Sequence, residues 1–167
     1  MDPDPAATAR AIVLRQLTAS AKSRQQLTRK LLEREIPEDV VEAVLDRFEE
    51  VRLVDDADFA ETWVRSRFAG RKLARSALQR ELQEKGIAED TAAAALEQVS
   101  DVDEDAAARI LVGRKLKVPV PDDRAEREKV TRRLVAMLAR KGYSPSMGFR
   151  IVNESIAAVT DAENPET

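Results

Sequence analysis

The residues of this sequence that could take part in binding or catalysis are its arginines and lysines, which are gathered into runs. Residues 5–37 hold seven basic side chains against two acidic ones, and residues 65–85 repeat that balance. Residues 38–61 hold ten acids against two bases, and residues 89–105 hold seven acids and no base. Although the net charge is only −3, such cationic runs can bind phosphates or an acidic protein surface. For any single run, a solvated helix face is the plainer interpretation.

Histidine and cysteine, which many enzymes use for catalysis, are both absent. Their absence removes thiolate zinc sites, cysteine nucleophiles, disulfides and the commonest general base. The sequence also lacks an apolar run that could span a bilayer, and its N-terminus does not read as a signal peptide. We therefore expect a cytoplasmic protein that is not an enzyme, uses no cofactor or metal and has no membrane partner. We also expect a monomer.

One stretch of the sequence recurs. Residues 23–39 (SRQQLTRKLLEREIPED) align without a gap on residues 74–90 (ARSALQRELQEKGIAED), and residues 130–146 form a weaker third copy. The copies begin about fifty residues apart, which indicates one small helical unit used three times. Few aromatics, five glycines and no sustained alternation of apolar and polar residues favour helices over a sheet.

Each copy reads as the end of one helix and the start of the next. In the second copy Gly86 can adopt the left-handed conformation that stops a helix, so Leu82 and Ile87 should touch across the stop. The third copy has Gly142 at this place. The first has Glu35, which would either cost about 1 kcal/mol in the left-handed region or require another kind of helix end.

We therefore predict an all-α protein of three tandem three-helix repeats. Ser23 with Gln26, and Asp123 with Glu126, have the spacing of helix capping boxes. The predicted segments are a disordered lead at 1–5, repeats at 6–52, 53–100 and 101–159, and a disordered tail at 160–167.

In each predicted repeat the first two helices are basic, and in the first two repeats the third helix is acidic. If the repeats stack in one orientation, their basic helices would form a cationic stripe that meets phosphates or an acidic protein surface. We predict partner or nucleic-acid contacts at nine residues: Arg65, Arg67, Arg71, Lys72, Arg75, Arg132, Arg133, Arg140 and Lys141.

Trp63 and Phe59 raise the question of base stacking. Aromatic rings beside arginines are one way in which proteins hold single-stranded nucleic acid. The i,i+4 spacing of these two residues, continued by Val64 and Phe68, is also that of a buried helix face. We favour the buried face.

Residues 53–90 carry a specific combination of features. They open with Leu-Val-Asp-Asp and continue with Phe-Ala, an aromatic residue before Val and Arg-x-Arg, a glycine-containing basic turn, Glu-Leu and Lys-Gly-Ile. These features fall on Leu53, Asp55, Asp56, Phe59, Ala60, Trp63, Val64, Arg65, Arg67, Gly70, Arg71, Glu81, Leu82, Lys85, Gly86 and Ile87. The combination resembles the central signature of the bacterial RecX regulatory proteins, and a weaker resemblance extends over residues 9–157. The chain departs from the pattern at Glu35 and at the insertion 118–121.

The resemblance implies a function as well as a fold. It implies an elongated, curved array of three three-helix repeats that regulates the RecA recombinase in DNA recombination, DNA repair and the SOS response. Such a protein would bind the RecA–single-stranded DNA filament, occupy its groove and inhibit its ATPase and strand exchange. The implied partner is the RecA nucleoprotein filament, and direct contact with single-stranded DNA stays open. The resemblance implies no catalytic residue.

Two alternatives stand beside this interpretation. Three-helix units with basic helices resemble helix-turn-helix proteins in outline, so a stand-alone DNA-binding protein is the first alternative. The second is a helical protein-interaction scaffold that binds other proteins through its acidic side.

Overall fold

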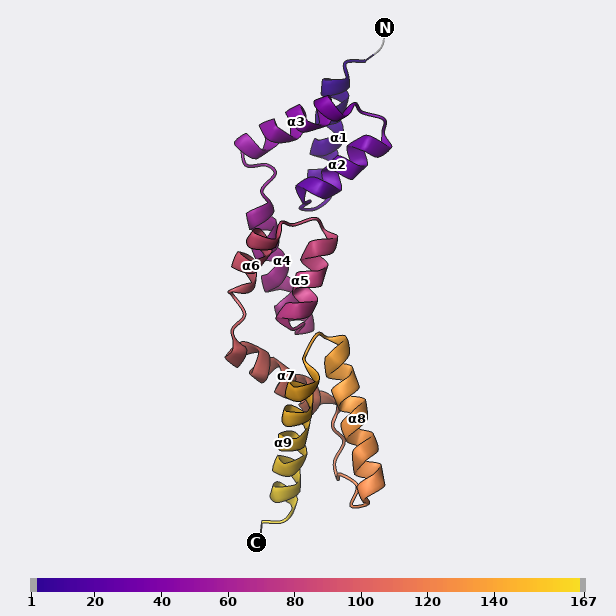
Figure 1. The fold of residues 1–167 in the computed structure, drawn as a ribbon, viewed down its shortest axis with the longest axis vertical. Coiled ribbons are helices and arrows are strands. Elements are labelled where there is room, and N and C mark those ends of the chain that lie inside the picture. The colour runs from indigo at the N-terminus through magenta and orange to yellow at the C-terminus, as the bar shows by residue number, and fades with distance from the viewer. Residues whose placement is uncertain (1–2, 166–167) are drawn as a thin grey trace. The chain divides into compact units, whose positions relative to one another are not determined.

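The chain is all-helical, as its sequence predicts. A computed structural model describes residues 3–165, and within them the chain forms nine α-helices and no strand (Figure 1). The helices are α1 (Pro5–Ala19), α2 (Arg24–Glu33), α3 (Glu38–Glu50), α4 (Asp56–Arg71), α5 (Arg75–Glu84), α6 (Glu89–Leu96), α7 (Asp101–Lys115), α8 (Arg124–Arg140) and α9 (Pro145–Glu163).

The predicted caps form at the starts of α2 and α8. The Oγ of Ser23 accepts the Gln26 N–H at 3.3 Å, and the Ser23 N–H donates to the Gln26 side chain at 3.0 Å, so this capping box is complete. Asp123 accepts the Glu126 N–H at 3.1 Å, but the Glu126 carboxylate lies 3.3 Å from Lys129 Nζ and is used there. Both caps satisfy an N–H group that the first turn of a helix leaves without a partner.

The predicted helix stop forms in all three copies of the repeated stretch. The N–H group beyond the stop returns to the carbonyl five residues earlier, from Ile36 to Leu31 at 3.1 Å, Ile87 to Leu82 at 3.0 Å and Tyr143 to Leu138 at 3.1 Å. Gly86 and Gly142 have φ angles of 76° and 96°, and Glu35 adopts the same left-handed conformation with φ 60°. The first copy therefore uses the same geometry without a glycine and bears its conformational cost.

The chain divides into two compact units. Unit 1 comprises the chain up to Val64 together with Gln79–Leu96, and unit 2 comprises Arg65–Leu78 together with the chain from Glu97 onward. The repeat boundaries at 6–52, 53–100 and 101–159 stay a prediction, because these contact-based units divide the predicted second repeat between them.

The predicted disordered ends fall partly outside the described residues, since residues 1, 2, 166 and 167 are not described. Pro5, placed in the lead by the sequence, is the first residue of α1, where Asp4 caps the helix. Helix α9 continues to Glu163, beyond the predicted end at Val159. Its last turn is closed by the Asn164 N–H, which donates to the Thr160 carbonyl at 3.2 Å.

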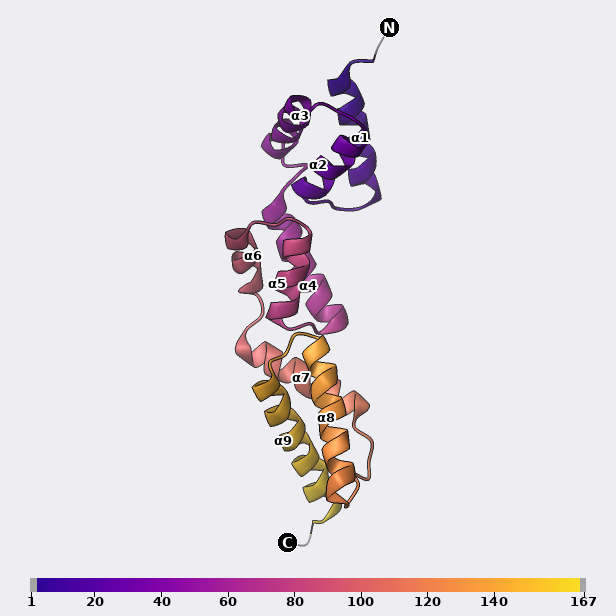
Figure 2. The ribbon, with the colours of Figure 1, turned by 45° about the vertical axis from the view of Figure 1, so that its right-hand side comes forward.

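Each unit has an aliphatic core. In unit 1, Leu27 and Leu31 of α2 are fully buried against Val13 of α1 and Leu45 of α3. In unit 2, α8 and α9 lie side by side in both ribbon views and α7 crosses behind them (Figures 1 and 2), and the buried residues of these helices include Val112, Leu134, Leu138 and Ile151. Burial of each such side chain contributes about 1.5–3 kcal/mol to the stability of its unit.

In unit 1 the start of α2 packs on the turn that ends α5, and we call this contact the first joint. Ser23 is fully buried there, and its Oγ donates to the Lys85 carbonyl at 2.6 Å. The adjacent Arg24 N–H donates to the carboxylate of Asp56, in the first turn of α4, at 2.8 Å. A helix start in one copy of the repeated stretch is therefore held by the helix stop of the next copy.

In unit 2 the start of α5 packs on the turn that ends α8 in the same way, and we call this contact the second joint. The Ala74 N–H donates to the Lys141 carbonyl at 2.9 Å. The Arg75 N–H donates to the carboxylate of Glu104, in the first turn of α7, at 3.2 Å. In the repeat alignment Ala74, Arg75 and Lys141 correspond to Ser23, Arg24 and Lys85. The two joints are therefore copies of one contact.

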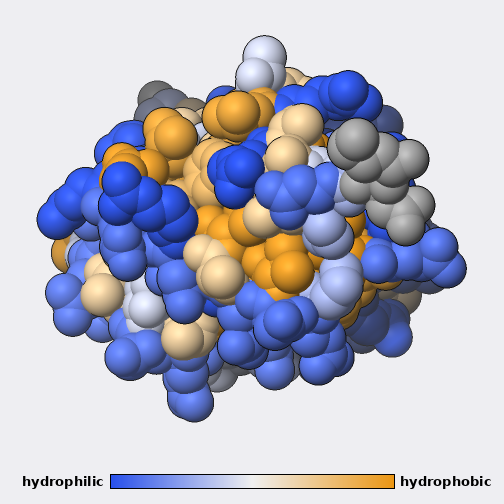
Figure 3. Space-filling model, turned by 90° about the horizontal axis from the view of Figure 1, so that it is seen from above, coloured by the Kyte–Doolittle hydropathy of each residue, from blue (hydrophilic) through white to orange (hydrophobic). Residues whose placement is uncertain are grey.

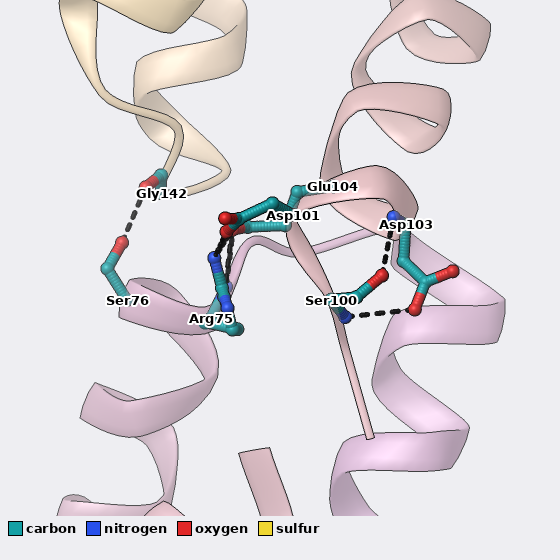
Figure 4. Close-up of polar contacts among 7 residues, drawn as sticks. All are labelled: Arg75, Ser76, Ser100, Asp101, Asp103, Glu104 and Gly142. Carbon is teal, nitrogen blue, oxygen red and sulfur yellow. Dashed lines mark hydrogen bonds and ion pairs between the residues drawn. The ribbon is translucent and has the colours of Figure 1, made fainter. Parts of the chain in front are cut away.

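The second joint also has contacts of its own (Figure 4). Ser76 Oγ donates to the Gly142 carbonyl. The carboxylates of Asp101 and Glu104, both from the first turn of α7, converge on the Arg75 guanidinium. These contacts fasten the start of α5 to both α7 and the turn after α8.

Candidate partner-binding surface

All nine cationic residues predicted as contacts belong to unit 2. Arg65, Arg67, Arg71, Lys72 and Arg75 lie in its Arg65–Leu78 segment, and the four others lie on α8 or just after it. The structure separates them into a structural residue, a cluster at the second joint, a groove beside α8 and three cations outside these groups.

Arg75 is a structural residue. Its guanidinium binds Asp101 and lies 2.6 Å from Glu104, whose side chain is only 12% exposed. The hydrogen bond that Arg75 donates to Asp101, together with the one that it donates to Glu104, holds the pKa of Arg75 above its usual value against the opposing effect of burial. Because this charge is neutralised within the chain, we leave Arg75 out of the proposed contact surface.

Three of the predicted cations meet where α4 and α8 end. Lys141 Nζ donates to the Arg71 carbonyl at 3.0 Å. The hydroxyl of Tyr143 donates to the carbonyl of Lys72 at 2.7 Å, and Lys72 itself is left-handed with φ 54°. Burial raises the pKa of Tyr143, so its hydroxyl stays a donor at physiological pH. These bonds hold Arg71, Lys72 and Lys141 close together.

Arg133 and Arg140 line a groove of about 270 Å³ beside α8. Lys115, the last residue of α7, and Lys117, in the loop that follows, lie on the same groove. We call it the cationic groove, and its full lining is Lys115, Lys117, Arg133, Leu134, Met137 and Arg140. Sequence reasoning did not place Lys115 and Lys117 in the site, although the basic run ending at Lys117 was a usable signal.

The four cations of the groove are exposed and form no ion pair within residues 3–165. Other cations of unit 2 are neutralised by their neighbours. Arg109 lies 2.6 Å from Asp105 and also pairs with Glu154, and Arg150 lies 3.0 Å from Asp105. The bond from Arg109, reinforced by Arg150, lowers the pKa of Asp105. The groove therefore keeps its positive charge while the α7–α9 contact has balanced charge.

The remaining predicted cations do not join the groove. Arg132 Nε lies 3.4 Å from the Glu128 carbonyl, and successive residues of a helix project about 100° apart, so Arg132 and Arg133 face differently. Arg65 is exposed on α4, and Arg67 is half-buried there. The prediction of partner or nucleic-acid contacts stays untested at all nine residues.

Two family models match the chain. They are described as the first and second three-helix domains of RecX, and they match residues 9–48 and 55–96. The RecX regulatory protein of Thermobifida fusca (strain YX) is 53% identical over 156 residues, covering 91% of this chain and 80% of the relative. This chain belongs to the RecX family. The RecX regulatory protein of Streptomyces coelicolor is 48% identical over 153 residues, covering 92% of this chain and 80% of the relative.

Solved RecX structures have the same fold. A crystal structure of RecX from Lactobacillus salivarius matches with a TM-score of 0.81 and 20% identity, over 93% of this chain and 98% of that chain. A second RecX crystal structure matches with a TM-score of 0.76 and 24% identity, over 90% of this chain and 74% of that chain. Neither of the two family models reaches the cationic groove, which lies beyond residue 96.

The two aromatic side chains of α4 in this RecX-family chain contact each other and other side chains of unit 1. Phe59 is buried and stacks on Trp63 with ring centroids 5.8 Å apart. The Trp63 Nε1–H donates to Glu81 at 3.1 Å, and Lys85 Nζ lies over the ring at 5.1 Å from its centroid. Phe59 is therefore buried as the buried-face interpretation predicts, whereas Trp63 is only half-buried and its ring is held by contacts within unit 1.

Unit 1 shows a different kind of surface. Seen from the N-terminal end of the chain, hydrophobic residues gather in the middle of the visible face and hydrophilic ones surround them (Figure 3). Leu14 and Leu32 are among the large apolar side chains that unit 1 exposes. Its Arg24, in contrast to the groove cations, pairs with Asp46 at 2.8 Å and Glu49 at 3.0 Å.

No three acidic side chains within residues 3–165 are grouped so that they could hold a metal ion. In the same part of the chain, no helix is both long and apolar enough to cross a membrane. The chemistry that the arrangement offers is binding by unneutralised cations.

Proposed function

We propose that this protein regulates RecA by binding the RecA–single-stranded DNA filament. It would occupy the filament groove and thereby lower the ATPase and strand-exchange activities of RecA. Membership of the RecX regulatory family, at 53% identity over 91% of the chain, is the observation that carries the proposal. The unpaired cations of unit 2 support it, because the filament presents phosphates and acidic side chains.

In the proposed mechanism, the bound protein inhibits RecA by occupying the filament groove. Two groups of unneutralised cations, the cationic groove and the cluster at the second joint, offer separate weak attachment points on one unit. Weak contacts that are engaged together give an affinity well above that of each contact alone. A protein held in this way would block the space that an incoming duplex must enter, and no catalytic group is needed.

The test is the ATPase of a bacterial RecA on single-stranded DNA, titrated with this protein at substoichiometric ratios. Inhibition that deepens with added protein and weakens with salt is expected, because exposed charge pairs are screened by ions. An unchanged ATPase rate, with strand exchange also unaffected, would rule the proposal out.

A mobility-shift assay with DNA alone separates this proposal from the main alternative. A filament regulator should bind free DNA weakly and without sequence preference, as counterion release by a few cations provides. Tight, sequence-selective binding in the absence of RecA would instead indicate a stand-alone DNA-binding protein. Recovery of other proteins but no RecA from lysate, with single-stranded DNA and ATP present, would indicate a scaffold.

A further inference from the structure

We infer that the cationic groove receives an acidic protein segment that inserts one apolar side chain between its carboxylates. The inference deepens the proposed function and rests on it, because the groove belongs to the cations put forward there as the filament contact. It adds the chemistry of the occupant, which is a peptide and not a nucleic acid.

The floor of the groove is the first argument. Leu134 is 1% exposed and belongs to the core of unit 2, and Met137 is half-buried beside it. An apolar side chain gains free energy on such a floor, whereas a phosphate would find donors only at the rim of the groove and none on its floor. The thioether of Met137 is unbranched and flexible, so it can adapt to the shape of an inserted side chain.

The size of the groove is the second argument. Its volume of about 270 Å³ lies just below the usual range of small-molecule pockets, which is about 300–1,000 Å³. It can take a side chain with part of its backbone, and a whole nucleotide would extend out of it. Among residues 3–165 no aromatic side chain lines it, so bases would lack the stacking platform that single-strand sites use.

The direction of the helices is the third argument. Phosphate sites commonly use the N–H groups at helix N-termini. The groove lies instead at Lys115, where α7 ends, and along the C-terminal half of α8. Its positive charge is therefore carried by four side chains alone. These long side chains carry separate charges around an apolar centre. Each lysine or arginine at the rim could therefore pair with one of several carboxylates spaced along a peptide.

The loop before α8 keeps the groove in shape. Val120 is buried in the core of unit 2, and Arg127 Nε donates to the Pro121 carbonyl at 2.6 Å. The insertion that departs from the repeat pattern is thus anchored at its far end, while Lys117 near its start remains exposed. Lys117, just before the insertion, is the residue of this loop that lines the groove.

The experiment uses the full chain and two synthetic peptides. In the first, glutamates flank a single leucine; in the second, serine replaces that leucine. Fluorescence anisotropy measures the affinity of each labelled peptide, and single-stranded oligothymidine is the nucleic-acid probe. We expect the leucine peptide to bind about tenfold more tightly than the serine peptide. We also expect rising salt to weaken both.

Three variants assign the binding to the groove. Met137→Ser should lower the affinity for the leucine peptide several-fold and leave the affinity for the serine peptide nearly unchanged. The two peptides and the two proteins form a double-mutant cycle, which measures the coupling between Met137 and the leucine. Arg133→Glu/Arg140→Glu should weaken both peptides about tenfold or more. Arg124→Glu/Lys129→Glu makes the same charge change nearer the start of α8 and should alter affinity by no more than about twofold. Far-ultraviolet circular dichroism checks that each variant is folded.

Several results would overturn the inference. If the two peptides bind equally, no apolar side chain is inserted. If the two double variants lose equal affinity, the groove is not the binding site. Oligothymidine binding that depends on Arg133 and Arg140, without peptide binding, would make the groove a phosphate site. The RecA ATPase separates the two proposals. If RecA is inhibited but the peptides do not bind, the groove inference fails alone. If the peptides bind as expected and RecA is unaffected, the regulatory proposal fails alone.

Discussion

The two joints use one contact in two settings, and the difference lies in what meets the glycine of the helix stop. At the first joint a Cβ on Gly86 would lie 2.4 Å from the Cβ of Gln25 and would overlap the end of that side chain. At the second joint a Cβ on Gly142 would lie 2.7 Å from the Cβ of Ala77 and 2.8 Å from its backbone nitrogen. The end of the Gln25 side chain can move, but its Cβ and the atoms of Ala77 are held in place by packed helices. Both joints should therefore tolerate substitution of the glycine poorly.

The first copy of the repeated stretch explains why these glycines are needed. Glu35 occupies the same left-handed stop, yet its side chain is exposed. The conformation alone costs a non-glycine residue about 1–2 kcal/mol, which the chain bears at Glu35. At Gly86 and Gly142 the approach of another helix start adds a steric requirement. The glycine is thus fixed by its neighbour as much as by its own φ angle.

The largest effect is expected from Gly142→Ala. The new Cβ would add overlap with Ala77 to the cost of the left-handed conformation, and together these should lower the free energy of unfolding by about 3 kcal/mol. Urea denaturation measures this change in the free energy of unfolding. Gly113→Ala is the matched control, because Gly113 lies in α7 with nothing within 4 Å of the added Cβ. The control should gain about 0.5–1 kcal/mol. Equal stabilities for the two variants would contradict the role given to the second joint.

Ser23→Ala should have the next largest effect. The change removes the α2 cap and leaves the part-buried Lys85 carbonyl without its hydroxyl donor, at a cost of about 2 kcal/mol. Thermal or urea unfolding measures the loss. Ser20→Ala, at an exposed serine just before it, should stay within about 0.5 kcal/mol of the parent protein. A loss as small as that of the control would mean that the first joint does not depend on this hydroxyl.

Glu35→Gly should stabilise the protein by about 1 kcal/mol, because glycine adopts φ 60° without a Cβ penalty. Glu35→Ala tests whether conformation or charge is responsible, since alanine removes the charge and keeps the penalty. We expect no comparable gain from alanine in the same denaturation experiment. A gain of equal size in both variants would assign the effect to charge.

The smallest effect should appear in the pH dependence, with opposite signs in the two units. Burial raises the pKa of Asp56 in unit 1 even though the Arg24 N–H opposes it, so its contribution is favourable at low pH and is lost as pH rises through the raised folded pKa. In unit 2 the pKa of Asp105 is lowered by Arg109. Its contribution is present above the unfolded value of about 3.9 and is lost as pH falls through the lower folded pKa.

Asp56→Asn and Asp105→Asn test this difference. Free energies of unfolding measured from about pH 3 to pH 7 should rise more steeply with pH in the Asp56 variant and less steeply in the Asp105 variant. Asparagine at 56 can still accept the Arg24 N–H, so any change there reports the carboxylate charge. Parallel changes in the two variants would contradict the assigned environments.

The sequence predicted the features that depend on neighbours along the chain. The Ser23 capping box, the left-handed stops and the aliphatic faces of the helices are set by residues within about five positions of one another. The capping box of Ser100 with Asp103 at the start of α7 was missed, because aspartate is shorter than the usual partners at that position. The membership of the RecX family was likewise visible in the signature at residues 53–90.

The candidate site could be predicted only as a set of charges. Sequence alone placed Arg75 among the contacts, and the folding of α7 beside α5 supplied the carboxylates that neutralise it, 26 and 29 residues away. Sequence alone left out Lys115 and Lys117, which the loop before α8 brings beside Arg133 and Arg140.

By itself the sequence determined where helices begin and end, which faces are apolar and how many cations are present, because these follow from local hydrogen bonding and periodicity. The tertiary structure decided which cations keep their charge and which glycines meet another helix. A charge is neutralised, and a Cβ is excluded, by atoms that approach through space from distant parts of the chain.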